Sequence, residues 1–194
     1  SFTSITIPDS VTSIGDEAFY QCSGLTSVII GNSVTSIGSN AFYQCSGLTS
    51  VTIGNSVTSI GYQAFYQCIV LTSVTIGNSV TKIGNDAFRY CYRLVEVYNK
   101  SALSITAGNS SNGYVAYYAK NVYKNEGGSK LTTDENGYVI YTDGDEMILV
   151  SYRGTNIELV LPSDITKINQ YAFFNCSALT SITIPDSVTS IGSY

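Results

Sequence analysis

Several residue types that enzymes and nucleic-acid-binding proteins depend on are missing or scarce in this sequence of 194 residues. It contains no histidine and no tryptophan, and only one methionine and three prolines. Without histidine, a Ser-His-Asp triad, a Cys-His dyad and a His-ligated zinc site cannot form within the chain. Charged residues make up 12 % of the sequence, against about 25 % in an average globular domain. The net charge of −5 argues against nucleic-acid binding, which requires a basic surface.

Long hydrophobic runs are absent as well. No apolar stretch approaches the roughly 20 residues that a membrane-spanning helix needs. Apolar residues nevertheless reach 44 % of the chain, which favours a folded core over disorder.

What the sequence does contain is a unit of 23 residues, repeated with near identity. The second, third and fourth units read LTSVIIGNSVTSIGSNAFYQCSG, LTSVTIGNSVTSIGYQAFYQCIV and LTSVTIGNSVTKIGNDAFRYCYR. The units span residues 2–24, 25–47, 48–70, 71–93, 156–178 and 179–194, the last one incomplete. Because four contiguous units are too similar for chance, we expect a solenoid in which each unit stacks on the next.

Each unit predicts the same short elements, which the unit 25–47 illustrates. Apolar residues alternate with others over Leu25–Ile30, which indicates a strand, and Gly31–Ser33 indicates a turn. Val34–Ile37 predicts a second short strand, and the apolar spacing within 41–45 predicts a short helical turn. The positions expected to point inward are Leu25, Val28, Ile30, Val34, Ile37, Ala41, Phe42 and Cys45. Strands of successive units would lie about 4.8 Å apart in one parallel sheet.

This pattern resembles the leucine-rich repeats, and more closely the BspA-type leucine-rich repeats of bacterial surface proteins and of some protozoa. The residues that carry the resemblance are LTSVTI, PDSVTSIG and the AFYQC segment, within 2–93 and 156–194. The resemblance implies a leucine-rich repeat solenoid, a β-rich α/β fold of right-handed coils with a parallel sheet. It also implies an extracellular or cell-surface setting and a role in binding or adhesion, and it brings no catalytic residues with it.

The period fails between residues 94 and 155. Residues 94–98 still indicate a repeat strand, and residues 113–118 resemble an enlarged Ala-Phe segment. Residues 121–123 would form the next strand, and the polar residues 124–136 predict an exposed loop.

A β-hairpin is predicted inside this interruption. The β-rich runs 137–142 and 147–152 flank Asp143–Glu146, and an Asp-Gly pair between such runs is typical of a hairpin turn. Because repeats of the family it resembles often carry such a hairpin within an enlarged coil, we expect one solenoid over residues 1–194. It would have about eight coils, two of them irregular.

Tyrosine is concentrated in the interruption, which holds half of the sixteen tyrosines between Tyr98 and Tyr152. One interpretation is that they pack the hairpin against the array. The other is an aromatic recognition patch, since tyrosine is enriched at binding surfaces. The candidate patch residues are Tyr114, Tyr117, Tyr118, Tyr138, Tyr141 and Tyr152.

Small hydroxyl side chains occupy most outward positions of the first strand in the units, and the exceptions are Ile29, Glu158 and Val160. Stacking would place them in two columns on a smooth, nearly uncharged face that could meet a protein or glycan. The alternative is that threonine simply favours strands. The candidate contact residues are Ser27, Ser50, Thr52, Ser73 and Thr75.

Five cysteines share one slot of the repeat, and they are Cys22, Cys45, Cys68, Cys91 and Cys176. We expect buried free thiols, because unpaired cysteine behaves as a small hydrophobe. Some disulfide bonding stays open, although an odd count does not suit a framework. A metal site would need convergent ligands, and Asp143–Glu146 lacks the further ligands of a calcium loop. No metal and no other cofactor is predicted.

Two function classes fit these observations. The first is a non-catalytic binding or adhesion module of a bacterial cell-surface or secreted protein, with a protein or glycan partner. The alternative is a structural spacer that presents another domain of a longer protein. An enzyme would require convergent carboxylates, and no acidic pair is marked out. Both ends cut through a repeat and show no polar cap, so we expect a longer protein or end-to-end stacking of solenoids.

Overall fold

The computed structural model describes residues 3–125 and 127–194, and it divides the chain into two compact units, Ser1–Gly128 and Ser129–Tyr194. Phe2, the expected first residue of the first repeat, lies outside the described residues. Each unit has its own hydrophobic core and its own parallel strand pairs.

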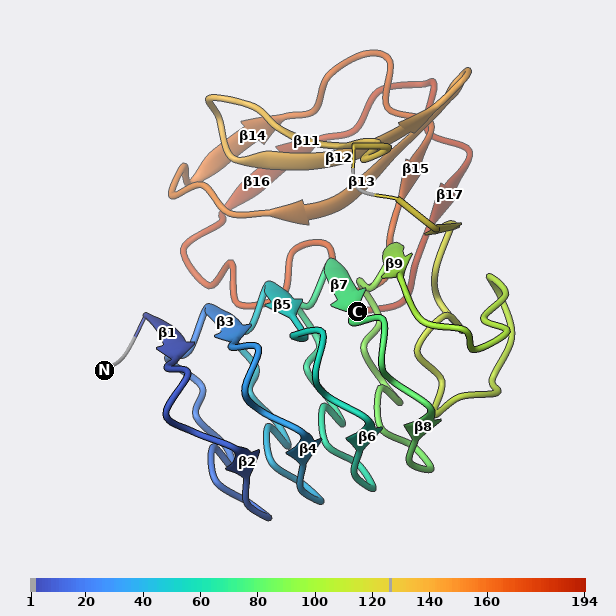
Figure 1. Cartoon of the computed structure of the whole chain (residues 1–194). Coiled ribbons are helices and arrows are strands. Elements are labelled where there is room, and N and C mark those ends of the chain that lie inside the picture. The colour runs from blue at the N-terminus through green and yellow to red at the C-terminus, as the bar shows by residue number, and fades with distance from the viewer. Residues whose placement is uncertain (1–2, 126) are drawn as a thin grey trace. The chain divides into compact units, whose positions relative to one another are not determined.

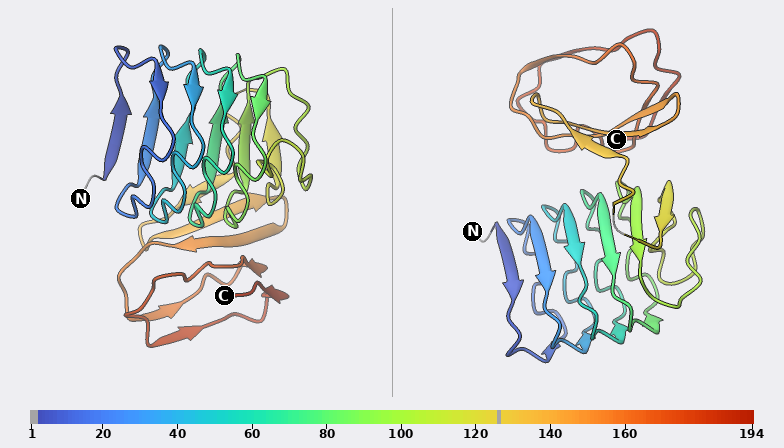
Figure 2. Two further views of the ribbon diagram at one scale, coloured as in Figure 1. Left: turned by 90° about the horizontal axis from the view of Figure 1, so that it is seen from below. Right: turned by 45° about the horizontal axis from the view of Figure 1, so that its top comes forward.

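In the first unit, each regular coil contributes one strand to a longer sheet and one to a shorter sheet (Figure 1, Figure 2). The longer parallel sheet contains, in spatial order, β1 (Ser4–Ile7), β3 (Ser27–Ile30), β5 (Ser50–Thr52), β7 (Ser73–Ile76), β9 (Glu96–Asn99) and β10 (Asn121–Tyr123). The shorter parallel sheet contains β2 (Ser13–Ile14), β4 (Ser36–Ile37), β6 (Ser59–Ile60) and β8 (Lys82–Ile83). The two strands predicted for each repeat and the strand predicted at 121–123 are confirmed.

The pairing register follows the repeat residue by residue. Ser27 pairs with Ser50, and Ser50 pairs with Ser73. The eight inward positions of the unit 25–47 are each no more than 2 % exposed, as predicted. Because equivalent side chains stack on one another, the core runs continuously through coils that could not bury it alone.

The helical turn expected at 41–45 is wrong, because left-handed residues precede and interrupt this segment. Asn40 and Gln44 have φ angles of 55° and 53°, and an α-helix cannot continue through such residues. The N–H of Phe42 donates to the carbonyl of Ala64 in the next coil, whereas a helix would direct it four residues back along its own chain. The described part of the chain contains no helix, and so none that could cross a bilayer.

The last coil of the first unit is enlarged. The N–H of Phe65 donates to the carbonyl of Ala87, and the N–H of Phe88 donates in the same way to Gly113. Val115 and Ala116 are buried in the first core. Residues 113–118 therefore take the place of the Ala-Phe segment, and the longer chain before them is accommodated as a loop.

The second unit opens with three antiparallel strands, β11 (Leu131–Thr133), β12 (Tyr138–Asp143) and β13 (Glu146–Tyr152). Strand β13 pairs in parallel with β15 (Lys167–Ile168), β15 pairs with β17 (Ser190–Ile191), and β14 (Glu158–Val160) pairs with β16 (Ser181–Thr183). The six strands of the longer sheet together with β14 and β16 mark eight solenoid turns over the two units.

The predicted hairpin is confirmed. Asp143 pairs with Glu146, so Gly144 and Asp145 form a two-residue loop, and the φ of 59° at Gly144 suits such a turn. The loop predicted over 124–136 is wrong in part, because β11 lies within it; residue 126 lies outside the described residues. The polar composition of this segment concealed an edge strand, which tolerates polar side chains on its exposed face.

The hairpin closes one side of the second core. Tyr138 and Tyr152 are each 4 % exposed and their ring centroids lie 5.3 Å apart. The Tyr138 hydroxyl donates to the carbonyl of Val160 at 3.2 Å, and the Tyr152 hydroxyl accepts from the Asn156 N–H at 3.0 Å. These two tyrosines therefore pack the hairpin on the coils that follow it.

Candidate ligand-binding surface

Stacked tyrosines line one corner of the regular coils in the first unit. Tyr20, Tyr43 and Tyr66 hold the same repeat position, and neighbouring ring centroids lie 5.0 Å apart with interplanar angles of 6°. In such a ladder each inner ring covers the faces of its neighbours. The ladder therefore presents ring edges and hydroxyl groups to solvent.

The ladder ends where the fourth unit departs from the repeat. Arg89 and Tyr90 replace the usual Tyr-Gln pair, and the Tyr90 ring meets Tyr66 edge-on, with centroids 5.2 Å apart and planes at 78°. From there an irregular group continues through edge-on and tilted contacts between 4.9 and 5.7 Å. This tyrosine cluster consists of Tyr90, Tyr92, Tyr114, Tyr117 and Tyr118.

A cation sits against the tyrosine cluster. The guanidinium of Arg89 lies 4.9 Å from the ring centroid of Tyr90 and 5.5 Å from that of Tyr114, within the range of cation–π attraction. Asp86 lies 3.6 Å from the same guanidinium. Burial, reinforced by the neighbouring Tyr92, raises the pKa of Tyr118 from its ordinary value near 10 to about 12.

The structure separates the six candidate tyrosines into two sets. Tyr114, Tyr117 and Tyr118 come together in the tyrosine cluster, and Tyr117 is 44 % exposed. Tyr138, Tyr141 and Tyr152 lie in the second unit and are at most 4 % exposed. The buried set follows the packing interpretation, so it does not enter the binding surface proposed below.

The two hydroxyl columns form along the strands except at Ile29, which pairs with Thr52 and is exposed. Their members on β3, β5 and β7 are Ser27, Ser50, Thr52, Ser73 and Thr75. They pair in register from coil to coil, and all are half-buried except the exposed Thr52. On β9 the columns end at Glu96 and Tyr98, where the Tyr98 hydroxyl donates to the Glu96 carboxylate at 3.0 Å.

The cysteine ladder consists of free thiols, but the burial expected of all five is wrong, because Cys22 is exposed and Cys176 is half-buried. Cys45, Cys68 and Cys91 are fully buried, and each sulfur lies 3.1 to 3.2 Å from a phenylalanine carbonyl of the preceding coil. Burial raises the pKa of the Cys45 thiol to about 12. Within residues 3–125 and 127–194, no group of three or more His, Cys, Asp or Glu is placed to hold a metal ion.

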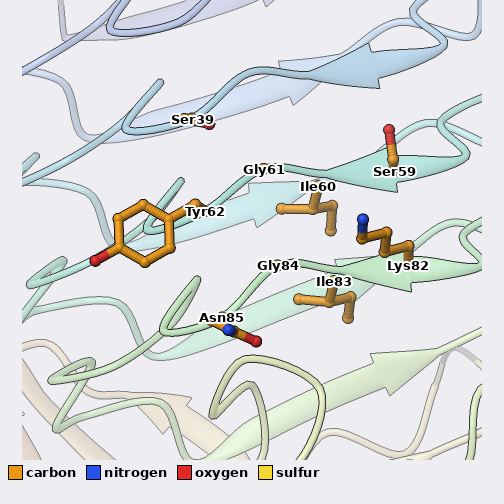
Figure 3. A pocket seen from close by; sticks show the side chains of 9 residues that line it. All are labelled: Ser39, Ser59, Ile60, Gly61, Tyr62, Lys82, Ile83, Gly84 and Asn85. Atoms are coloured by element: carbon orange, nitrogen blue, oxygen red, sulfur yellow. The ribbon is translucent and has the colours of Figure 1, made fainter.

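A groove of about 540 Å³ crosses three coils of the first unit beside the shorter sheet (Figure 3). We name it the Tyr62 groove. Figure 3 shows Tyr62 and Lys82 on opposite sides of the apolar side chains of Ile60 and Ile83. The Tyr62 side chain is 49 % exposed, and Asn85 lies on the same side of the groove as Tyr62 (Figure 3).

The Tyr62 groove was not predicted from the sequence, although two departures from the repeat mark it. Tyr62 stands where the unit 25–47 has Ser39, and Lys82 stands where the unit 48–70 has Ser59. Single substitutions of this kind form no recognisable motif in the sequence. Their relation becomes visible only when stacking brings three units side by side.

Comparison with known proteins gives a consistent family assignment. The BspA type Leucine rich repeat region matches the sequence in six copies, over residues 1–111 and 151–194. Among curated proteins, none matches the sequence.

Solved structures of bacterial leucine-rich repeat proteins are similar to this chain. The leucine-rich repeat protein of T. pallidum is 21 % identical with a TM-score of 0.51, over 97 % of this chain and 72 % of that one. A leucine-rich cell surface protein from Faecalibacterium prausnitzii is 27 % identical with a TM-score of 0.39, over 98 % of this chain. A leucine-rich repeat protein from Bacteroides ovatus is 23 % identical with a TM-score of 0.40, again over 98 %. This chain spans 65 % of the F. prausnitzii protein and 57 % of the B. ovatus protein.

Proposed function

The chain belongs to the BspA-type leucine-rich repeat family, and we propose that it is a non-catalytic binding module of a bacterial cell-surface or secreted protein. Its partner would be a protein or a glycan. Membership in a family of bacterial surface proteins supports the location and the class of function. The tyrosine cluster is the observation that supports binding, because it breaks the repeat and leaves aromatic side chains at the surface.

The chemistry of the tyrosine cluster suits recognition. Tyrosine combines a large apolar ring with a hydroxyl that can donate or accept, and only two side-chain torsions need to be fixed on binding. Arg89 adds a planar cation beside the rings of Tyr90 and Tyr114. Tyrosine and arginine are among the residue types that most often dominate the binding energy of interfaces.

The experiment measures binding of the purified chain to a panel of immobilised extracellular-matrix proteins and glycans by surface plasmon resonance. The test variant carries Tyr92→Ser and Tyr117→Ser. Serine at position 92 restores the residue found at the same place in the unit 25–47, at Ser46, so the backbone should tolerate it. The matched control is Tyr20→Ser at the far end of the tyrosine ladder.

We expect at least one partner to bind the wild type and the control alike, and to bind the test variant at least tenfold more weakly. If no partner binds, or if the double substitution changes no affinity, the tyrosine cluster is not a recognition surface.

A second function, that of a structural spacer, is favoured by the near identity of the units 25–47 and 48–70. Their exposed positions carry mostly serine, threonine and asparagine, and the stacking of identical coils would set a distance without engaging a partner. The spacer function predicts that a full-length protein binds its partner equally well with and without the Tyr92→Ser and Tyr117→Ser substitutions.

A further inference from the structure

We propose that the Tyr62 groove binds a carboxylate-bearing pyranose, such as a sialic acid or a uronic acid residue of a glycan. This inference rests on the proposed binding function and names a ligand class for a second place on the same unit. It is carried by four observations: two substitutions in the repeat array, an exposed aromatic ring, a lysine with no ion pair among the described residues, and the size of the groove.

The substitutions are the first observation. The third unit differs from the second at five positions and the fourth at eight. Tyr62 and Lys82 are among these differences, and both line one groove. Stacking does not require either residue, because Ser39 and Ser59 serve at the same positions in neighbouring coils. Their large side chains therefore add to the surface rather than to the core.

The Tyr62 ring is the second observation. The rings of the tyrosine ladder cover one another, but within the described part of the chain no aromatic ring packs against Tyr62. Figure 3, which looks into the groove, shows this ring face-on. An open aromatic face matches the apolar C–H face of a pyranose, whose carbon-bound hydrogens meet the negative centre of the ring.

The third observation is the charge of Lys82. It is the one charged residue among the nine that line the groove. Among residues 3–125 and 127–194, its ammonium group has no ion pair and no side-chain hydrogen bond. An unengaged ammonium in a groove is suited to a carboxylate, which it would bind through charge-assisted hydrogen bonds. The chain as a whole is acidic, with a net charge of −5, so attraction for an anion must come from such a local cation.

The size and polarity of the groove are the fourth observation. About 540 Å³ falls within the usual range for small-molecule sites. Ser39, Ser59 and Asn85 line the groove with hydroxyl and amide groups, which pair with sugar hydroxyls as donors and as acceptors. A second groove of about 350 Å³ shares Asn85 and reaches Tyr114, so a longer glycan could continue along the coils.

An acidic peptide is the competing occupant, and the groove favours the saccharide over it. One lysine gives a peptide a single anchor. Tyr62 and Asn85 instead offer the combination of a ring face and a side-chain amide, which a polyhydroxylated ring uses more fully. The peptide is kept as a separate arm of the test.

The experiment uses two matched pairs of small saccharides and measures their affinity for the full chain by calorimetry. The first pair is 3′-sialyllactose and lactose, and the second is tetragalacturonate and its methyl ester. A tetraglutamate peptide forms the fifth arm. The variants are Lys82→Ser and Tyr62→Ser, which restore residues of neighbouring coils, and Tyr62→Phe, which keeps the ring. The matched control is Lys120→Ser, an exposed lysine outside the groove. Circular dichroism verifies that each variant folds.

We expect at least one carboxylated saccharide to bind, and to bind at least tenfold more tightly than its uncharged counterpart. The sialic acid and uronic acid arms decide which sugar class it is. Lys82→Ser should remove the preference for the charged sugar, a loss of about tenfold or more. Tyr62→Ser should weaken both members of a pair, whereas Tyr62→Phe and Lys120→Ser should leave the affinities unchanged.

Three outcomes would overturn the inference: no carboxylated saccharide binds, charged and uncharged saccharides bind equally, or the peptide binds more tightly than either acid. None of these outcomes would contradict the binding function of the tyrosine cluster, because that function is tested with substitutions at Tyr92 and Tyr117 and with a different panel of partners. Failure of the Tyr62 groove and failure of the proposed function can thus be told apart.

Discussion

Replacing Phe65 by alanine tests whether the first unit is held together by a core that continues from coil to coil. The Phe65 side chain is fully buried, and its ring stacks between Phe42 and Phe88 at centroid distances of 5.0 and 4.9 Å. A buried Phe→Ala substitution costs about 3–5 kcal/mol of unfolding free energy. Because two stacking contacts of about 0.5–1.5 kcal/mol each are lost, and the flanking coils are hydrogen-bonded too firmly to collapse, we expect about 4 kcal/mol.

Phe19 supplies the comparison, since it holds the same repeat position at the end of the phenylalanine stack formed by Phe19, Phe42, Phe65 and Phe88. It is only half-buried and stacks on one neighbour, Phe42, at 4.9 Å. Phe19→Ala should therefore cost about 2 kcal/mol, half the transfer and stacking loss of the inner ring. Urea denaturation followed by circular dichroism gives both values, and hydrogen exchange locates the loss in the first unit. If Phe65→Ala costs no more than Phe19→Ala, the description of one continuous core is refuted.

Three further predictions follow from burial and hydrogen bonding. Under native conditions the exposed Cys22 should react quickly with a disulfide reagent. Cys45 should react only after unfolding, because it is buried and burial raises its pKa to about 12. Rapid reaction of a majority of the five thiols would contradict this prediction. The pKa of Tyr118 is raised to about 12 in the folded chain. The stability that the protonated phenol contributes is therefore complete below the unfolded pKa near 10 and is lost as the pH rises through 12. A urea midpoint that is the same at about pH 9 and about pH 11 would argue against this contribution. Tyr152→Phe removes the acceptor for the Asn156 N–H and should destabilise the second unit by about 1 kcal/mol, which thermal unfolding can measure against the wild type.

Much of the fold could be predicted because the repeat fixes the register. Once Ser27 and Ser50 are known to hold equivalent positions, their pairing on adjacent strands follows, and so does the burial of Leu25 and Leu48. The helical turn was wrong because apolar spacing does not distinguish a helix from a series of turns. The difference lies in the left-handed backbone at Asn40, which sequence spacing does not reveal.

The candidate surface was predictable only in part. A concentration of tyrosine pointed to residues 98–152, but composition does not separate Tyr117 at the surface from Tyr141 in the interior. That separation depends on which strand faces carry core residues, which the interruption of the repeat left undetermined. The Tyr62 groove depends on three coils at once, so it follows from stacking geometry and from no single unit.

The direction of the hydrogen bonds between coils has a mechanical consequence. In the first unit these bonds run from one coil to the next, as from Phe42 to Ala64, and thus along the axis of stacking. Tension applied along that axis passes through every interface between coils, and the outermost coil, which is bonded to a neighbour on one side only, would come away first. Each coil of 23 residues would then release about 75–80 Å of extended chain, in place of a stacking repeat near 5.0 Å. A stack of this kind yields one coil at a time, and it lengthens as a tether long before its last coil unfolds.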